Sequence, residues 1–298
     1  MVKRFLSYVE IKTKITSIFP FLMTLAYLYY NGKDIHPLRT AVFFCGMLLF
    51  DLTATTINNY EDTKKNRQTL QFNRRTAFYI TAVLFLFSAV LGIYLVSLTD
   101  IVVLLLGGLC FLFGVLYSWG PLPLSHSPLG EAASGFFYGF VIPLILYYIN
   151  APKALFTYSV SMERISADIN VSPAVGFLLL SVMPFCLTAG VMLANNICDL
   201  ERDVKVRRYT LAYYLKRRAV YVFALLYYTA YASVIVMVIA GFLSPLSLLV
   251  LITLIPVQKN ITVFMKKQVK EETFTVSIQN FILMMSVHII LIVAGRLL

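Results

Sequence analysis

Long apolar stretches recur along the whole chain and are separated by short polar segments. Nine of them are long enough, or nearly so, to cross a hydrocarbon core about 30 Å thick. They lie near residues 15–30, 39–57, 76–97, 101–118, 129–149, 173–196, 217–240, 244–257 and 277–296. Only helices and closed barrels satisfy every backbone group in lipid, and these continuous apolar runs lack barrel alternation. The pattern predicts an all-α polytopic membrane protein with about nine transmembrane helices in a single domain, residues 1–298.

Composition supports this class and excludes a soluble globule. Hydrophobic residues make up 59% of the chain and charged residues 13%, whereas soluble domains carry about 25% charged residues. Too little polar surface remains to cover a globular protein. The formal net charge of +11 would suit a nucleic-acid partner or basic membrane loops, so the positions of the basic residues decide between the two.

Basic residues are divided unequally between the two sets of loops. Twenty of the 25 Lys and Arg residues lie in the N-terminal segment and in the loops after the second, sixth and eighth stretches. Because such residues concentrate in cytoplasmic loops, we expect the N-terminus in the cytoplasm and the C-terminus outside. The positive net charge is thus explained by the membrane topology. We expect membrane lipids as partners and no nucleic acid. The oligomeric state stays open.

One short string occurs twice, 137 residues apart, at equivalent places in the topology. Residues 58–62 read Asn-Asn-Tyr-Glu-Asp and residues 195–199 read Asn-Asn-Ile-Cys-Asp. On a helix, residues four apart share one face, so each string presents a stripe of oxygen atoms. The stripes contain Asn58 and Asp62 on the first helix and Asn195, Asp199 and Asp203 on the second. The repetition predicts two pseudo-equivalent halves.

Oxygen stripes of this kind suit Mg²⁺, which prefers hard ligands and is usually completed by water and substrate phosphates. Basic residues follow each string: Lys64, Lys65 and Arg67 after the first, and Lys205, Arg207 and Arg208 after the second. Acidic stripes beside cations predict a site that holds Mg²⁺ and a diphosphate together. The alternative is that the strings cap two helices and the basic residues set the topology.

The second string and its surroundings resemble a known motif. Residues 195–212, which read Asn-Asn-Ile-Cys-Asp-Leu-Glu-Arg-Asp-Val-Lys-Val-Arg-Arg-Tyr-Thr-Leu-Ala, resemble the second aspartate motif of the UbiA superfamily of intramembrane prenyltransferases. Residues 58–66 resemble its first motif, and residues 117–121 with 128–131 resemble the segment after its fourth span. Within the superfamily, the chain is most similar to the 1,4-dihydroxy-2-naphthoate prenyltransferases of menaquinone synthesis.

The chain departs from the family pattern at three places. Asn59 stands where the family usually has its first Asp, and no Asp follows Asp62 within the next six residues. Arg207 replaces a frequent Gly. The first stripe is therefore less acidic than is usual in the family.

The resemblance implies UbiA-like helices around a central cavity. It implies Mg²⁺-dependent transfer of a polyprenyl group from polyprenyl diphosphate to an aromatic acceptor, with 1,4-dihydroxy-2-naphthoate losing CO₂ to give demethylmenaquinone. The implied catalytic residues are Asp62, Asp199 and Asp203, and the implied Mg²⁺ ligands are Asn58, Asp62, Asn195, Asp199 and Asp203. The implied diphosphate-binding residues are Lys65, Tyr117, Lys205 and Arg208. The implied location is a bacterial cell membrane, with the active site at the cytoplasmic face.

Several alternatives remain open at the level of the sequence. Another acceptor, such as 4-hydroxybenzoate or haem, would keep the same mechanism. A cation transporter would place carboxylates near the middle of the membrane, where Asp51 is the exception to the clustering at one face. Tyr117 also fits an interfacial aromatic belt. Lys12 and Lys14 would either meet an acceptor carboxylate or serve as topology signals.

Overall fold

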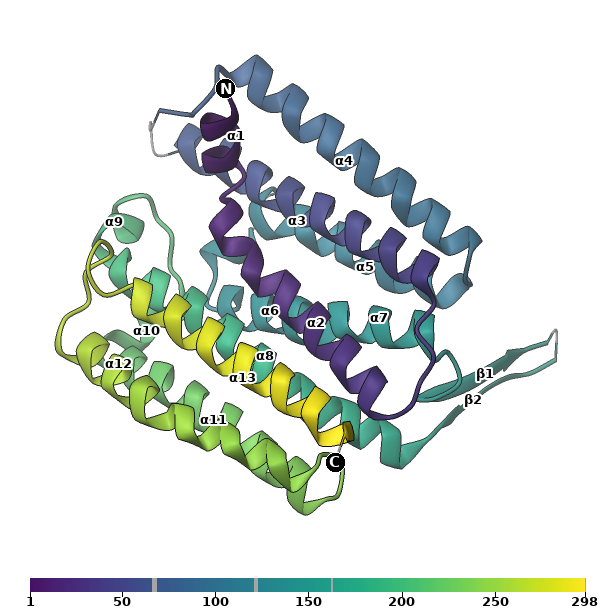
Figure 1. Ribbon diagram of the computed structural model, residues 1–298. Helices are drawn as coiled ribbons and strands as arrows, with labels where there is room; N and C mark the ends of the chain where they lie inside the picture. Colours follow the sequence, from purple (N-terminus) through teal and green to yellow (C-terminus); the bar gives the residue numbers. More distant parts are fainter. Residues whose placement is uncertain (66–68, 121–122, 162, 298) are drawn as a thin grey trace.

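The computed structural model describes residues 1–65, 69–120, 123–161 and 163–297, apart from the side chains of residues 64, 65, 160 and 165. Within these residues, eight helical segments reach 18 residues and are apolar enough to cross a membrane. Helix α2 (Ile15–Tyr30) has 16 residues and lies inside the bundle (Figure 1). The structure confirms the prediction of a helical membrane protein with about nine transmembrane helices.

The first half of the chain contributes the upper helices of Figure 1. Its elements are α1 (Val2–Tyr8), the 3-10 turn η1 (Ile11–Lys14), α2, α3 (Pro37–Lys65), α4 (Arg74–Ser97) and α5 (Ile101–Ser118). Helix α3 packs along α4, and both contact α5. Few of the side chains on α4 and α5 are buried, as expected for helices that face lipid.

The fifth span is a helix that changes its winding in the middle. After the 3-10 turn η2 (Leu124–His126), α6 (Gly130–Phe136) leads into a π-helical turn, η3 (Phe137–Val141), and then into α7 (Ile142–Asn150). A Cβ atom on Gly139 would lie 2.2 Å from the backbone nitrogen of Phe185. Glycine at this position lets η3 pack directly against the backbone of the next span.

The second half of the chain follows a short β-hairpin. Its elements are β1 (Phe156–Val160), β2 (Ile165–Ile169), α8 (Val171–Cys198), α9 (Leu200–Lys205), α10 (Leu211–Leu215), η4 (Lys216–Arg218), α11 (Ala219–Ile239), η5 (Pro245–Thr253), α12 (Leu254–Lys266) and α13 (Thr275–Leu297). Helix α8 lies at the centre, and α11, α13 and α6 pack on it. Its middle is almost entirely buried.

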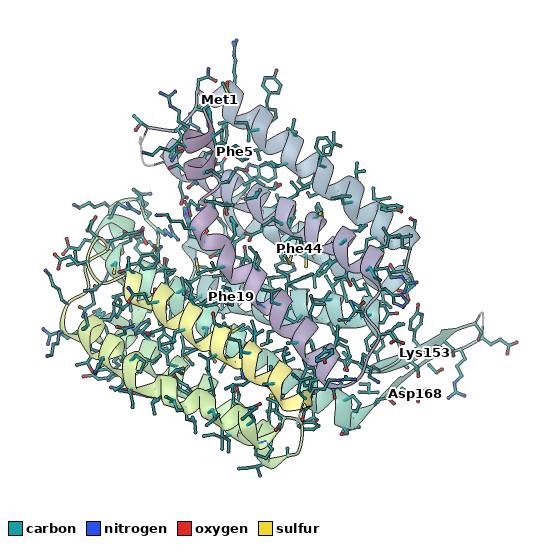
Figure 2. The ribbon with its side chains drawn as sticks, in the orientation of Figure 1. Met1, Phe5, Phe19, Phe44, Lys153 and Asp168 are labelled. Atoms are coloured by element: carbon teal, nitrogen blue, oxygen red, sulfur yellow. The ribbon has the colours of Figure 1, made fainter. Side chains whose placement is uncertain are left out.

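The hairpin β1–β2 is an addition to the all-helical prediction. The two strands pair antiparallel, with Phe156 opposite Ile169 and Thr157 opposite Asp168. Figure 2 shows Lys153 and Asp168 at this end of the molecule and Met1 and Phe5 at the other end. Figure 1 shows α3 and α8 both ending on the side away from the hairpin. The two repeated strings therefore lie at the same end of the bundle.

Candidate active site

A cavity of about 750 Å³ opens between the helices that carry the two strings. Residues of α3 and α8 line it from two sides, and α4, α5 and α6 with η3 complete its wall. Six of the predicted site residues line the cavity: Asn58, Asp62, Tyr117, Asn195, Asp199 and Arg208. The fold thus brings together strings that lie 137 residues apart in the sequence.

The first string lies wholly within helix α3. The apolar stretch ends near residue 57, but the helix continues to Lys65, so Asn58 and Asp62 share one face as expected. The Oδ1 atom of Asn58 accepts a hydrogen bond from Ser118 Oγ at 2.9 Å. Asp62 faces two basic side chains from other segments, with Nε2 of His126 at 3.5 Å and Nη1 of Arg208 at 3.6 Å.

The second string spans a break between two helices. Helix α8 ends at Cys198, and Asp199 occupies the junction with α9. Backbone bonds still run from Asp199 N to Asn195 O at 3.0 Å and from Asp203 N to Asp199 O at 2.9 Å. The predicted four-residue spacing is therefore kept, although the predicted continuous helix is not. Asp203 is buried and does not belong to the residues that line the cavity.

Arg208 connects the two strings. Its Nε donates to the carbonyl oxygen of Ser125 at 2.9 Å and lies 3.7 Å from Oδ2 of Asp203, while its Nη1 approaches Asp62. Burial raises the pKa of the Asp203 carboxyl above its ordinary value, and the nearby Arg208 guanidinium opposes that shift. A guanidinium offers several donors in one fixed plane, so a single side chain serves both helices.

A tight turn places Arg208 at this position. The backbone N–H of Arg208 donates to Asp203 O at 2.9 Å, and Arg207 adopts a φ of 59°. Residues other than glycine rarely occupy that left-handed region, because the Cβ atom crowds the backbone. The conformation explains why glycine is frequent here in the resembling family, and this chain makes the same turn with arginine.

A second layer of buried groups supports Arg208. Glu131 is 3% exposed and accepts a hydrogen bond from Asn196 Nδ2 at 2.9 Å. The Oδ1 atom of Asn196 in turn accepts from Arg208 Nη2 at 3.4 Å. Tyr117 lines the cavity beside this layer, and Ser134 Oγ donates to its hydroxyl at 3.1 Å.

The other two predicted diphosphate residues have different outcomes. Lys205 is exposed on α9 and does not line the cavity. The side chain of Lys65 lies outside the described residues. Two other cations reach the second string instead: Nη2 of Arg202 lies 3.1 Å from Oδ2 of Asp199, and Nζ of Lys270 pairs with the same oxygen. Both of these cations line the cavity.

Among the described residues, no three His, Cys, Asp or Glu side chains gather closely enough to hold a metal ion by themselves. At the two strings, the cavity offers the carboxylates of Asp62 and Asp199 and the amide oxygens of Asn58 and Asn195. Such a donor set fits a hard cation that keeps several waters and takes its remaining ligands from phosphate oxygens. It therefore fits Mg²⁺ bound together with a diphosphate better than a metal held by protein alone.

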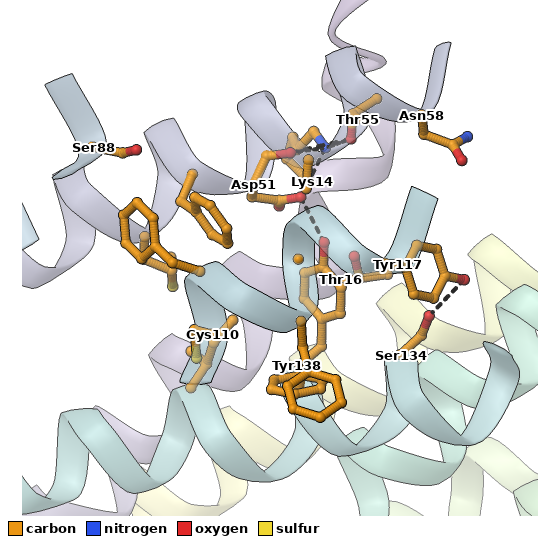
Figure 3. Close-up of a pocket in the computed structure, with 18 of the residues that line it drawn as sticks. Lys14, Thr16, Asp51, Thr55, Asn58, Ser88, Cys110, Tyr117, Ser134 and Tyr138 are labelled. Atoms are coloured by element: carbon orange, nitrogen blue, oxygen red, sulfur yellow. Dashed lines mark hydrogen bonds and ion pairs between the residues drawn. The ribbon is translucent and has the colours of Figure 1, made fainter. Parts of the chain in front are cut away.

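A second polar cluster lies deeper in the same cavity (Figure 3). Nζ of Lys14 lies 2.8 Å from Oδ1 of Asp51, and the two side chains are 2% and 4% exposed. Tyr138 OH donates to Asp51 Oδ1 at 2.7 Å, and Ser17 Oγ donates to Asp51 Oδ2 at 2.6 Å. Lys14 also donates to Thr55 Oγ1. Lys12 is exposed and does not line the cavity, so the two N-terminal lysines differ in their surroundings.

The remaining lining is apolar. It comes mainly from α3, α4 and α5 and includes Val42, Phe43, Leu91, Ile93, Leu95, Val103, Leu104 and Phe111. A Cβ atom on Gly107 or Gly108 would meet no heavy atom within 4 Å. The cavity thus joins a charged end at the two strings to an apolar region between lipid-facing helices.

Comparison with known proteins agrees with the motif analysis. A model of the UbiA prenyltransferase family matches residues 17–282. A 1,4-dihydroxy-2-naphthoate octaprenyltransferase of Bacillus subtilis (strain 168) is 32% identical over 155 residues, which cover 52% of this chain and 44% of that protein. The match therefore spans less than half of that relative's length.

Solved structures share the fold at low sequence identity. A UbiA homologue from Aeropyrum pernix K1 has a TM-score of 0.65 and 16% identity, with 91% of this chain and 97% of that chain covered. A UbiA homologue from Archaeoglobus fulgidus bound to GPP and Mg²⁺ has a TM-score of 0.62 and 12% identity, with 99% and 100% covered. At these identities the likeness establishes the architecture.

Proposed function

Since this chain belongs to the UbiA prenyltransferase family, we propose that it transfers a polyprenyl group from polyprenyl diphosphate to an aromatic acceptor in the membrane. One observation carries the proposal: two oxygen-rich strings with adjacent cations face each other at one end of a cavity whose other end is apolar. A diphosphate with a long hydrocarbon tail has the same two-part character. Within this class, we propose 1,4-dihydroxy-2-naphthoate as the acceptor.

The charged end would hold the diphosphate. Arg208, Arg202 and Lys270 all line the cavity and lie beside Asp62 or Asp199. Each of them would exchange a carboxylate partner for a phosphate oxygen as the donor binds, which costs little because the positive charge stays paired. The hydroxyl of Tyr117 would donate to the same group.

The carboxylates and amides would hold the metal. We propose Asn58, Asp62, Asn195 and Asp199 as ligands of Mg²⁺, with Asp203 held beside them by Arg208. When bound, Mg²⁺ neutralises charge on the diphosphate and makes it a better leaving group. The protein's own cations stabilise the same developing charge in a site that was arranged before the reaction.

The apolar end would orient the two substrates. The allylic C–O bond breaks with its electron pair going to the diphosphate, and a ring carbon of the acceptor forms the new C–C bond. In the naphthoate case the ring loses its carboxyl group as CO₂. Aromatic side chains in the wall, such as Phe50 and Phe111 with ring centroids 4.1 Å apart, would exclude water and face the cationic carbon.

Two features of known proteins support the proposal. The Bacillus subtilis relative is named for octaprenyl transfer to 1,4-dihydroxy-2-naphthoate, and the Archaeoglobus fulgidus homologue was solved with GPP and Mg²⁺. A cation transporter fits the cavity less well, because Arg208, Arg202 and Lys270 would repel a permeating metal ion.

The test is a reaction with purified protein in lipid. Polyprenyl diphosphate, Mg²⁺ and 1,4-dihydroxy-2-naphthoate should give prenylated product and CO₂, and EDTA should stop the reaction. Product formed from 4-hydroxybenzoate but not from the naphthoate would overturn the acceptor and keep the mechanism.

Aspartate variants test the site itself. Asp62→Ala and Asp199→Ala should each lower kcat by at least about 10²-fold, since each removes a proposed ligand of the Mg²⁺ that stabilises the leaving diphosphate. Asp168→Ala on the hairpin serves as the matched control and should keep full activity. Normal turnover in both site variants would overturn the diphosphate site.

A further inference from the structure

In the Lys14–Asp51 ion pair, Asp51 lies inside the membrane-spanning helix α3 and Lys14 at the start of α2, and the proposed reaction leaves the pair without a role. Charged side chains within transmembrane helices are costly, and those that persist usually serve function. Four groups of this cluster line the reaction cavity: Lys14, Asp51, Thr55 and Tyr138. The cluster therefore belongs to the space that the substrates would fill.

The position of Asp51 relative to the first string locates the cluster. Asp51 precedes Asn58 by seven residues on the same helix, which places it about 10 Å deeper along the axis of α3. A diphosphate at Asn58 and Asp62 would direct its first allylic carbon toward this depth. The aromatic acceptor has to meet that carbon, so its ring would lie close to Asp51.

The hydrogen bonds around Asp51 show which ligand it could accept. A carboxylate has about four lone-pair positions. Oδ1 accepts from Lys14 and Tyr138, and Oδ2 accepts from Ser17. One position on Oδ2 is left for a further donor. The Tyr138 bond already pairs a phenol with this carboxylate, and a phenolic acceptor offers the same donor group.

Lys14 holds the Asp51 carboxylate in position. Lys14 lies 2.8 Å from Oδ1 and also donates to the backbone carbonyl of Asp51 at 3.1 Å. Lys14 uses its three donors on Asp51 and Thr55, so its role concerns Asp51 and not an acceptor carboxylate.

We propose that Asp51 binds a hydroxyl group of the aromatic acceptor and accepts its proton during ring attack. As the O–H proton moves to Asp51 Oδ2, the oxygen electron pair enters the ring, and the ring carbon bonds to the allylic carbon. The C–O electron pair leaves with the diphosphate. The attacked ring then releases H⁺, or CO₂ from an acid acceptor, and Asp51 returns its proton to the oxygen. The inference rests on the proposed function.

The experiment pairs one residue with one substrate group. Wild type and Asp51→Asn are assayed with 1,4-dihydroxy-2-naphthoate and with each of its two monomethyl ethers. Acid–base catalysis contributes about 10²-fold or more, so Asp51→Asn should lose that factor in kcat with the parent acceptor. With one of the two ethers, the kcat of the wild type should fall by a similar factor. The kcat of Asp51→Asn should not fall further with that ether, because the substitution and the methylation remove the same interaction.

Controls separate this role from a structural one. Asp100 also accepts a hydrogen bond from a tyrosine, Tyr148, at 2.5 Å, but it does not line the cavity. Asp100→Asn should keep wild-type kcat and the wild-type preference among the acceptors. Binding of geranyl diphosphate with Mg²⁺ should stay unchanged in Asp51→Asn. If that variant does not fold, Lys14→Met/Asp51→Leu removes both charges together and should show the same kinetic loss.

The outcomes are distinct. An active wild type whose Asp51→Asn variant keeps its kcat within threefold, or keeps the preference for the free hydroxyl, overturns the role of Asp51 alone. A wild type that forms no product with either aromatic acid overturns the proposed function and this inference with it.

Discussion

Three carboxylates that line the cavity face a cation from another part of the chain. Asp62 faces Arg208, Asp199 faces Lys270, and Asp51 faces Lys14. Removing one partner of a buried pair leaves an uncompensated charge, which costs about 3–5 kcal/mol. The site is therefore neutralised by its own residues before a substrate enters.

Arg208 gives a prediction at the scale of one residue. Arg208→Ala should lower kcat/KM for the diphosphate donor by about 10²-fold or more, because it removes a fixed cation beside the leaving group. Arg208→Lys should restore a small part, since lysine lacks the planar fork that reaches Ser125, Asp62 and Asp203.

Steady-state kinetics with varied donor concentration provide the measurement. Arg217→Ala is the control, because Arg217 is exposed in η4 and does not line the cavity. Equal donor kinetics in wild type and Arg208→Ala would contradict the assignment.

The sequence predicted the two strings but not their ionic partners. Asn58, Asp62, Asn195 and Asp199 stand out because polar oxygens are rare in an apolar chain and repeat with helical spacing. The partner His126 lies in η2, Arg202 lies on α9, and Lys270 follows α12, 71 residues from Asp199. A Lys or Arg residue in a cytoplasmic segment supports the same topology whichever way its side chain points. Its ionic partner can therefore be identified only from the structure.

At the scale of elements, hydropathy located the spans but not all of their ends. The apolar stretch in α3 ends about two turns before the helix does. The helix continues because its backbone hydrogen bonds also form between polar residues. The hairpin β1–β2 was missed, although Phe156, Tyr158 and Val160 alternate with polar residues. Five residues of alternation are a weak signal beside apolar stretches of twenty.

Packing between η3 and α8 gives a prediction at this scale. Gly139→Ala should destabilise the protein, because its methyl group would overlap the backbone of Phe185 at 2.2 Å and overpacking costs about 1–3 kcal/mol or more. Thermal unfolding in detergent measures the effect as a lower Tm.

Gly190→Ala on α8 is the matched control. A Cβ atom there would find its nearest neighbour at 3.8 Å, which is ordinary contact. The control should keep the Tm or raise it, since alanine favours helices over glycine. An unchanged Tm in Gly139→Ala would show that η3 can move away from α8.

At the scale of the whole molecule, the two ends of the bundle differ. The N-terminal helix α1 contacts α3 near the first string, where Asn59 Nδ2 donates to Tyr8 O at 2.9 Å. The opposite end holds the hairpin and the C-terminal Arg296, which contacts Tyr29 at the end of α2. The cavity's charged end and the N-terminus thus lie at the same end of the bundle, and the distribution of basic residues predicts that this end is cytoplasmic.

Labelling tests that topology. In a variant without native cysteines, Arg217→Cys at the string end should react with a membrane-impermeant maleimide from the cytoplasmic side of sealed vesicles. Ser161→Cys at the hairpin should react from the opposite side. Both positions are exposed, so access to the thiol depends on the side of the membrane. Reversed labelling would contradict the predicted orientation.

The hydrogen bond between Tyr138 and Asp51 depends on the π-helical turn η3. A π turn carries one residue more than an α turn over the same rise, and Tyr138 lies inside it. Deleting one residue between 137 and 141 would restore regular winding without rotating the flanking helices α6 and α7, and would change which side chain of this turn faces Asp51. The contact between Tyr138 and Asp51 therefore depends on the extra residue of the π turn, and a chain with a regular helix here would place a different side chain opposite Asp51.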